Sequence, residues 1–300
     1  MMSKLGLIGL GNIGEPVCRN LLKGGYEVVV YDAGRAAMTR LEDTGAEPAE
    51  SPRELASVAD VVLLSLPNSA VIEEVVLGEN GLLESLSPGK VLIDTSSSKP
   101  SSTRMISERL AEAGVDMLDA PVSGGVIKAR EGTLAVMVGG NREVFEKCYP
   151  IFDAFGGDVF FVGDHGAGHL TKALNNLLSA TTLASASEAV ILAERAGLSP
   201  ELFVEVINAS NGRSYSTEVK FPKYILDRSF DDGFATALMN KDLKIALEAA
   251  AEMDFPMLIG STVAQVWQAA VAQGNGARSH TEIFAFLENM TGGRETEDGH

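Results

Sequence analysis

A lysine and two asparagines near the middle of the chain recur at helical spacing. Gly168, Lys172 and Asn176 are separated by intervals of four residues, so a helix would place them on one face, with Asn175 beside it. An amine held near a hydroxyl-bearing carbon can exchange the hydroxyl proton during hydride transfer, and a carboxamide can orient the amine or the substrate. Lys172 is therefore a candidate general acid/base, although a lysine considered alone is more often solvated.

A serine followed by two glycines supplies a candidate anion site. Ser123, Gly124 and Gly125 come just after an expected strand and offer one hydroxyl and two unhindered backbone amides, a combination suited to a carboxylate. Judged by residue types alone, an ordinary Ser-Gly-Gly turn remains the favoured alternative.

A glycine-rich segment near the N-terminus has the spacing of a dinucleotide-binding turn. It follows an expected strand, opens an expected helix, and consists of Gly9, Leu10, Gly11, Asn12, Ile13 and Gly14. Asp32 ends the next strand, where a carboxylate can bind the adenine-ribose diol and would repel a 2′-phosphate. We expect NAD to be preferred, while Arg35 could moderate that repulsion and leaves NADP use open.

Two further pairs of residues fall at the carboxyl ends of neighbouring strands. Leu66-Pro67 follows one strand and Ser96-Ser97 follows the next. Ligands of open sheets bind at these ends, although each pair taken alone is an ordinary turn or helix cap.

The elements that must position these residues divide the chain into two domains. Before residue 164, β-branched runs alternate with amphipathic segments, which predicts a doubly wound α/β Rossmann-type domain over residues 1–163. The expected strands are 4–8, 27–31, 61–65, 91–94, 116–119 and 133–138, and the expected helices are 13–23, 52–57, 69–76 and 101–113.

The remainder, residues 164–300, is predicted to be all α-helical. Its first element is a long helix over about residues 167–195, which joins the two domains and has no Pro or Gly from His169 to Arg195. Further helices are expected at 200–209, 215–226, 238–253, 261–273 and 281–290, before a charged, frayed tail.

Composition excludes several classes of partner. The net charge of −17 would repel nucleic acid and anionic membranes, and no apolar run approaches the length of a membrane span. The N-terminus does not have the pattern of a signal peptide, so we expect a soluble, cytoplasmic protein. We also expect Cys18 and Cys148 to be free thiols, and the four histidines to form no metal site.

Taken together, the motifs resemble the β-hydroxyacid dehydrogenase family of 3-hydroxyisobutyrate dehydrogenases and 2-hydroxy-3-oxopropionate reductases. The resemblance covers essentially the whole chain and depends on five segments in family order. They are GLIGLGNIGEPVCRNLL, DAPVSGG, GTLAVMVGG, GAGHLTKALNN and the later Asn240-Lys241-Asp242-Leu243.

The resemblance implies a role for each matching residue. Lys172 would be the general acid/base, Asn176 and Asn175 would position the substrate, and Ser123, Gly124 and Gly125 would bind its carboxylate. The remaining implied residues belong to the cofactor site. Lys241 would approach the cofactor, and Leu66, Pro67 and Ser97 would line the part of the site that binds the nicotinamide half. The family also implies a homodimer or homotetramer.

The resemblance implies reversible hydride transfer between NAD(P) and a short β-hydroxyacid of the 3-hydroxyisobutyrate, glycerate or threonate kind. Two alternatives remain: an imine reductase, which resembles this fold but generally has Asp or Tyr in place of Lys172, and a non-catalytic dinucleotide-binding protein. Arg213, Lys128 and Phe234 are further candidates for recognising the substrate. His169 is near Lys172 along the helix and could tune it, but a capping or solvent-facing histidine is favoured.

Overall fold

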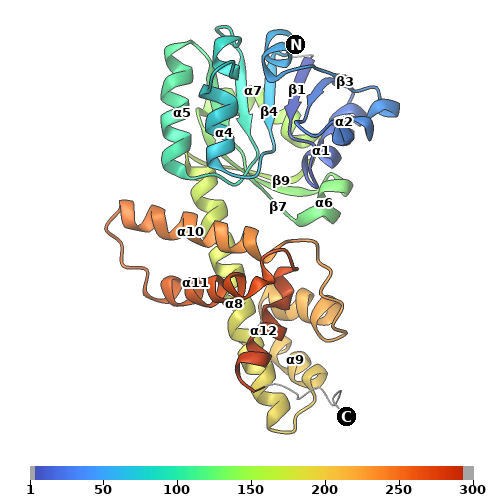
Figure 1. Cartoon of the computed structure of the whole chain (residues 1–300), viewed down its shortest axis with the longest axis vertical. Helices are drawn as coiled ribbons and strands as arrows, with labels where there is room; N and C mark the ends of the chain where they lie inside the picture. Colours follow the sequence, from blue (N-terminus) through green and yellow to red (C-terminus); the bar gives the residue numbers. More distant parts are fainter. Residues whose placement is uncertain (1–3, 293–300) are drawn as a thin grey trace. The chain divides into compact units, whose positions relative to one another are not determined.

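The computed structural model describes residues 4–292, and the expected frayed tail lies outside this range except for Gly292. The chain forms two compact units, Met1–Lys172 and Ala173–His300, which are considered separately below. Figure 1 shows the α/β character of the first unit and the helical character of the second.

The first unit is built on one sheet, and within residues 4–172 this sheet has nine strands in the order β3-β2-β1-β4-β5-β6-β8-β7, with β9 paired to β8. Their bounds are β1 Lys4–Ile8, β2 Glu27–Tyr31, β3 Glu47–Pro48, β4 Val61–Leu64, β5 Val91–Asp94, β6 Asp116–Asp119, β7 Val122–Ser123, β8 Leu134–Gly140 and β9 Gly156–Gly163. Strands β1 to β6 are parallel, whereas β8 runs antiparallel to β6 and β7. The strand order reverses direction between β1 and β4, which is where ligands bind in doubly wound sheets.

Helices cover both faces of this sheet. One face packs against α1 (Gly14–Lys23), α6 (Gly125–Glu131) and α7 (Arg142–Asp153). The other packs against α3 (Pro52–Val58), α4 (Ser69–Leu77) and α5 (Pro100–Glu112), of which α4 and α5 lie side by side in Figure 1. Burial on both faces explains why the central strands are continuous apolar runs, and it confirms the predicted Rossmann-type unit.

Several elements of the first unit were not predicted from the sequence. They are α2 (Arg35–Thr39), η1 (Glu42–Thr44), η2 (Leu82–Glu84), β3, β7 and β9, together with α6 and α7. Strand β3 is two residues long and contains Pro48, and α7 carries Pro150 in its interior. Proline is disfavoured inside both strands and helices, so the local sequence of these two elements predicts an interruption instead of a strand or a helix.

The long helix α8 (Ala167–Arg195) has the bounds that the sequence predicts. Contrary to the expectation that no apolar run approaches a membrane span, an 18-residue window of this helix is apolar enough to cross a membrane by length and composition, with a mean hydropathy of 1.2, but half of that window is buried inside the structure. Ala180, Leu183 and Val190 belong to the core of the helical unit, so α8 has the burial of a core helix.

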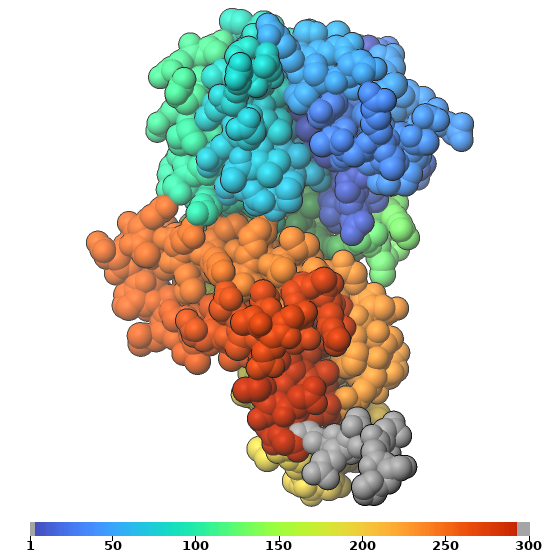
Figure 2. Space-filling model, viewed as in Figure 1, coloured from blue at the N-terminus to red at the C-terminus, as the bar shows by residue number. Residues whose placement is uncertain are grey.

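The helical unit packs around the second part of α8. Its further elements are α9 (Pro200–Asn208), the π-helix η3 (Ser216–Ile225), α10 (Thr236–Glu252), α11 (Leu258–Ala270), the π-helical turn η4 (Val271–Asn275), the short η5 (His280–Glu282) and α12 (Ile283–Met290). Trp267 and Phe221 are fully buried in its core. The side chains of α10 to α12 form a continuous surface, coloured orange to red in Figure 2.

Candidate functional site

The glycine-rich turn connects β1 to α1 in a conformation that requires its glycines. Gly9 has a φ of 95° and its N–H donates to the carbonyl of Tyr31 at 2.9 Å. A Cβ on Gly14 would overlap the carbonyl oxygen of Gly9, so Gly14 permits the close packing of α1 on the turn. A Cβ on Gly11, in contrast, would meet no atom within 4 Å, which leaves open space over this part of the backbone.

The start of α1 is suited to a phosphate group. Its N-cap residue, Ile13, provides no side-chain cap, so the positive end of the helix dipole can face an anion, although Pro16 has no N–H and the N–H groups of Glu15 and Val17 donate to the carbonyls of Gly11 and Ile13. Beside this turn, the Asp32 carboxylate accepts hydrogen bonds from the N–H of Leu10 and of Gly34, each at 2.7 Å. The residues present therefore fit a dinucleotide.

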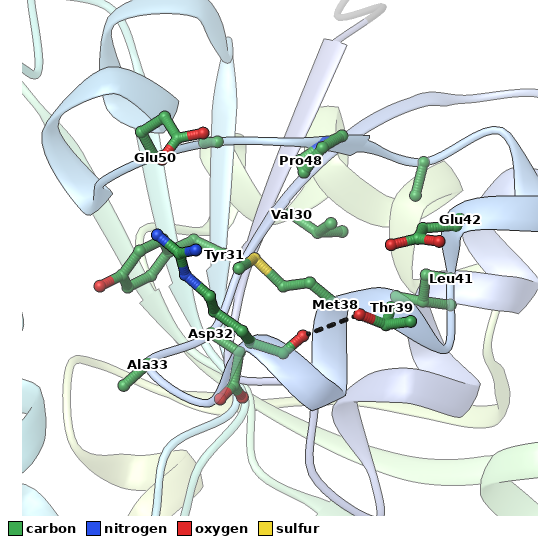
Figure 3. A pocket seen from close by; sticks show the side chains of 13 residues that line it. Val30, Tyr31, Asp32, Ala33, Met38, Thr39, Leu41, Glu42, Pro48 and Glu50 are labelled. Atoms are coloured by element: carbon green, nitrogen blue, oxygen red, sulfur yellow. Dashed lines mark hydrogen bonds between the residues drawn. The ribbon is translucent and has the colours of Figure 1, made fainter.

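A pocket of about 500 Å³ adjoins Asp32 at the carboxyl end of β2 (Figure 3). Val30, Met38 and Leu41 give it apolar walls. Its charged lining residues are Asp32, Arg35, Glu42 and Glu50. Its place beside the carboxylate suits the adenosine half of a dinucleotide, and its acidic side chains disfavour an additional phosphate.

The loops that follow β4 and β5 are hydrogen-bonded to each other. The N–H of Leu66 donates to Oγ of Ser96 at 2.8 Å, and the N–H of Lys99 donates to Oγ of Ser69 at 2.9 Å. A Cβ on Gly9 would come within 3.3 Å of the Leu66 side chain, so the glycine-rich turn lies against the first of these loops. Pro67 is exposed and Ser97 half-buried in the same two loops, so the predicted residues of the nicotinamide half gather at one edge of the sheet.

The Ser-Gly-Gly segment joins β7 to α6. Ser123 pairs with Ala135 of β8, while Gly124 and Gly125 have φ values of 133° and 70° that other residues rarely adopt. Both glycines are exposed and Ser123 is half-buried, so the hydroxyl stands next to accessible backbone amides at the start of α6.

The start of α8 is fastened to the end of β6 by Asp119. Its carboxylate accepts hydrogen bonds from the N–H of Gly166 at 2.8 Å and of His169 at 3.0 Å. Burial raises the pKa of Asp119, although the nearby His169 and these backbone donors oppose the rise. Lys172 follows one turn later on α8 and is half-buried.

His169 itself differs from the prediction. It is 1% exposed and its Nδ1 lies 2.6 Å from Oγ1 of Thr103 on α5, so it neither faces solvent nor uses its side chain as a helix cap. The prediction failed because the sequence does not show that α5 packs over this turn of α8.

In the helical unit, Asn176 is held by a residue to which the sequence analysis gave no role. Its Nδ2 donates to Oδ2 of Asp242, and its Oδ1 accepts from Nδ2 of Asn175 at 3.1 Å. Asp242 also pairs with Lys241, whose Nζ lies 3.1 Å from Oδ1. Asp242 is 2% exposed, so this contact joins a half-buried lysine to a buried carboxylate and is not a surface charge pair. The only signal was its place beside Lys241.

The three further candidates for substrate recognition differ in their exposure to solvent. Arg213 and Lys128 are exposed, whereas Phe234 is half-buried with its ring edge-on to His280 at 5.4 Å. The structure between residues 4 and 292 contains no group of three or more His, Cys, Asp or Glu side chains arranged to hold a metal ion.

Comparison with known proteins covers both units. Residues 4–163 match the model for the NAD binding domain of 6-phosphogluconate dehydrogenase, and residues 166–287 match the model for the NAD-binding domain of NADP-dependent 3-hydroxyisobutyrate dehydrogenase. The chain is 40% identical to 2-(hydroxymethyl)glutarate dehydrogenase of Eubacterium barkeri, with 96% of each chain covered. It is 36% identical to NAD-dependent L-serine dehydrogenase of Pseudomonas aeruginosa, with 97% of this chain and all of the relative covered.

A solved structure is similar over the same length. Mycobacterium tuberculosis 3-hydroxyisobutyrate dehydrogenase with L-serine has a TM-score of 0.89 and 31% identity, covering 96% of this chain and 99% of the other. These matches agree with the glycine-rich turn, the acidic residue after β2 and the helical second unit. The chain therefore belongs to the β-hydroxyacid dehydrogenase family, whose members are NAD(P)-dependent oxidoreductases acting on hydroxyl groups.

Proposed function

We propose that the protein oxidises the 3-hydroxyl group of a short β-hydroxyacid with NAD, reversibly, and that Lys172 is the general acid/base. The observation that carries the proposal is the position of Asp119. This residue ends the strand that leads to Ser123, and its carboxylate binds the first turn of the helix that bears Lys172. One strand end therefore supports both the candidate anion site and the candidate base.

Bound NAD supplies the hydride acceptor. Lys172 takes the proton from the 3-hydroxyl oxygen as the carbonyl forms, and returns it in the reductive direction. The Ser123 hydroxyl and the amides of Gly124 and Gly125 hold the substrate carboxylate. Asn176 directs one amide N–H to Asp242, and its second N–H remains to orient the substrate oxygen.

The names of the relatives narrow the substrate class. The compounds 2-(hydroxymethyl)glutarate, 3-hydroxyisobutyrate and L-serine differ in size and charge, but each has a primary alcohol on the carbon β to a carboxylate. We therefore place this chain's substrate among 3-hydroxypropanoates that carry a substituent at C2.

The test is the absorbance of reduced cofactor, with NAD and separately with NADP, across 3-hydroxyisobutyrate, L-serine, glycerate, threonate, 3-hydroxypropionate and 2-(hydroxymethyl)glutarate. We expect turnover of at least one acid to fall on the order of 10³-fold in Lys172→Ala. The exposed Lys147→Ala variant is the control and should retain wild-type turnover. Full turnover in Lys172→Ala would exclude the lysine mechanism, and no turnover of any acid by the wild type would exclude the substrate class.

We further propose a cytoplasmic homodimer or homotetramer. Large apolar side chains exposed on the helical unit support an oligomer, since such patches commonly mark interfaces. They include Leu178, Leu192, Leu258 and Ile259, each at least 67% exposed. Light scattering on the purified protein would show a mass of two or four chains, and a monomer would exclude this part of the proposal.

A further inference from the structure

A buried polar cluster lies one helical turn before Lys172. It contains His169, Thr103, Asp94 and Asp119, whose side chains come from α8, α5 and the carboxyl ends of β5 and β6. Each of these residues is at most 5% exposed. The cluster is within the first unit, and the function proposed above gives a role only to Asp119, as a support for α8.

The imidazole lies between Thr103 and Asp94. Its Nδ1 lies 2.6 Å from Oγ1 of Thr103, and its Nε2 lies 3.6 Å from Oδ2 of Asp94. The Thr103 hydroxyl also lies 3.2 Å from the carbonyl oxygen of Lys99, to which it can donate while it accepts a hydrogen from Nδ1. Nε2 and Oδ2 of Asp94 are too far apart for a hydrogen bond, so the contact with Thr103 is the one that orients the ring between α5 and β5.

The backbone of the same turn is also held. Asp119 accepts from the N–H of His169 and of Gly166, while Oδ1 of Asp94 accepts from the N–H of Ser96 in the loop after β5. Gly168 completes the close approach, because a Cβ there would overlap the carbonyl oxygens of Met137 and Asp119. The first turn of α8 is therefore attached to α5 through the His169 side chain and to the end of β6 through the His169 backbone N–H.

We propose that His169 is a positioning residue for Lys172, and that its contact with Thr103 sets where the lysine amine stands. Residues three apart lie on neighbouring parts of a helix surface, so rotation or shift of this turn moves the Lys172 amine directly. Misplacement of a catalytic group by about 1 Å can cost on the order of 10²-fold in rate. The inference depends on the proposed role of Lys172 as general acid/base.

The test exchanges Thr103 rather than the histidine, because a change in the larger ring would also alter packing. Thr103→Val has nearly the same shape but cannot bond to Nδ1, whereas Thr103→Ser keeps the hydroxyl. Ser107→Ala, one turn further along α5, removes a hydroxyl that bonds only to the local carbonyl of Arg104 and is the matched control.

We expect kcat to fall about tenfold or more in Thr103→Val, with KM for the hydroxyacid and Kd for NAD within about threefold of wild type. Thr103→Ser should recover most of the loss, and Ser107→Ala should match wild type. A kcat within about threefold of wild type in Thr103→Val, or parallel losses in KM, Kd and thermal stability, would overturn the positioning role.

A double-mutant cycle with Lys172→Ala separates positioning from a general structural effect. Single-turnover hydride transfer at high enzyme concentration measures the residual rate in that background. If His169 acts through Lys172, Thr103→Val causes no further loss there, whereas an equal loss in both backgrounds would refute the inference. If Lys172→Ala retains wild-type turnover, the proposed function fails and this inference fails with it. If Lys172→Ala is inactive and Thr103→Val is fully active, only the inference fails.

Discussion

The carboxylate of Asp32 accepts a hydrogen bond from the backbone N–H of Leu10 at 2.7 Å, which joins the end of β2 to the glycine-rich turn. Its second oxygen accepts from the N–H of Gly34. Asp32, the candidate ribose-binding residue, therefore also maintains the shape of the glycine-rich turn, which is the candidate pyrophosphate site. Substitution at this position should affect both ends of the cofactor site.

The first prediction concerns cofactor preference. Asp32→Asn keeps one acceptor oxygen but loses the negative charge and one acceptor, so both the diol and the turn are held less well. We expect kcat/KM with NAD to fall on the order of 10- to 100-fold, and the NADP-to-NAD ratio to rise because the repulsion of a 2′-phosphate disappears. Steady-state kinetics with both cofactors measures this, with the exposed Asp158→Asn as control. An unchanged ratio would argue against recognition through Asp32.

The second prediction separates two glycines of the same turn. A methyl group on Gly11 enters open space, whereas one on Gly14 overlaps the carbonyl oxygen of Gly9. Gly11→Ala should retain its melting temperature and lose affinity for NAD, because the methyl group stands where the pyrophosphate approaches. Gly14→Ala should unfold at lower temperature even without cofactor. Calorimetry and cofactor titration on both variants check this, and the reverse order of effects would contradict the assignment.

The sequence predicted the fold well where burial on both faces leaves long apolar runs. Strands β1, β2, β5 and β6 have their predicted bounds, and α8 was found because no Pro or Gly interrupts it. The pattern failed at the short elements that depend on contacts distant in sequence. Strand β3 exists because Val29 and Val30 of β2 pair with Glu47 and Pro48, which no local pattern reveals.

For the candidate site, motif spacing identified the residues that follow strand ends. It missed the buried residues that fix their positions through contacts with distant parts of the chain. The glycine-rich turn and Ser123-Gly124-Gly125 have local signatures, because φ values above zero require glycine. His169 and Asp242 have none. Their roles arise from contacts with Thr103 and Asn176, which lie 66 residues away in sequence in both cases.

The third prediction concerns Asp242. The side chain of Asp242→Asn has one oxygen and one NH₂ group. In one orientation the NH₂ group faces Asn176, and in the other it faces Lys241, so one of the two contacts is lost. We expect kcat/KM for the hydroxyacid to fall on the order of tenfold or more, with the larger share in KM if Asn176 orients substrate. Lys244→Ala, an exposed change on the same helix, is the control. Wild-type kinetics in Asp242→Asn would show that this contact has no part in substrate binding.

The fourth prediction concerns the two thiols. Cys18 and Cys148 are free, as expected from the sequence, and the structure buries both fully, which raises the pKa of each thiol to about 12. Because the thiolate is the reactive form, iodoacetamide at pH 8 should label neither residue in the native protein and both in denaturant. Activity should survive the native treatment. Rapid labelling of either cysteine in the folded protein, read by mass spectrometry, would contradict their burial.

The last prediction concerns a buried contact between a histidine and an aspartate in the helical unit. Nδ1 of His280 lies 2.9 Å from Oδ2 of Asp232. Burial lowers the pKa of His280 below 6.5, and the charge of Lys220 adds to this effect, although Asp232 opposes it. For Asp232, burial raises the pKa, but hydrogen bonds from His280 and Ser279 outweigh burial and leave the value below 3.8.

These directions set the pH dependence of stability. Below pH 6.5 the unfolded chain protonates His280 more readily than the folded chain does, so the free energy of unfolding decreases as the pH falls through 6.5. The Asp232 contribution is lost only below about pH 3.8, and comparison with a variant that does not titrate at position 280 separates the histidine effect from that of other groups, such as Asp119. Between pH 8 and pH 5.5, the wild type should lose about 2–5 °C more in melting temperature than His280→Gln, which keeps an N–H donor but does not titrate. His165→Gln, in the first unit, should follow the wild type. Equal losses in His280→Gln and the wild type would show that His280 titrates alike in the folded and unfolded chains.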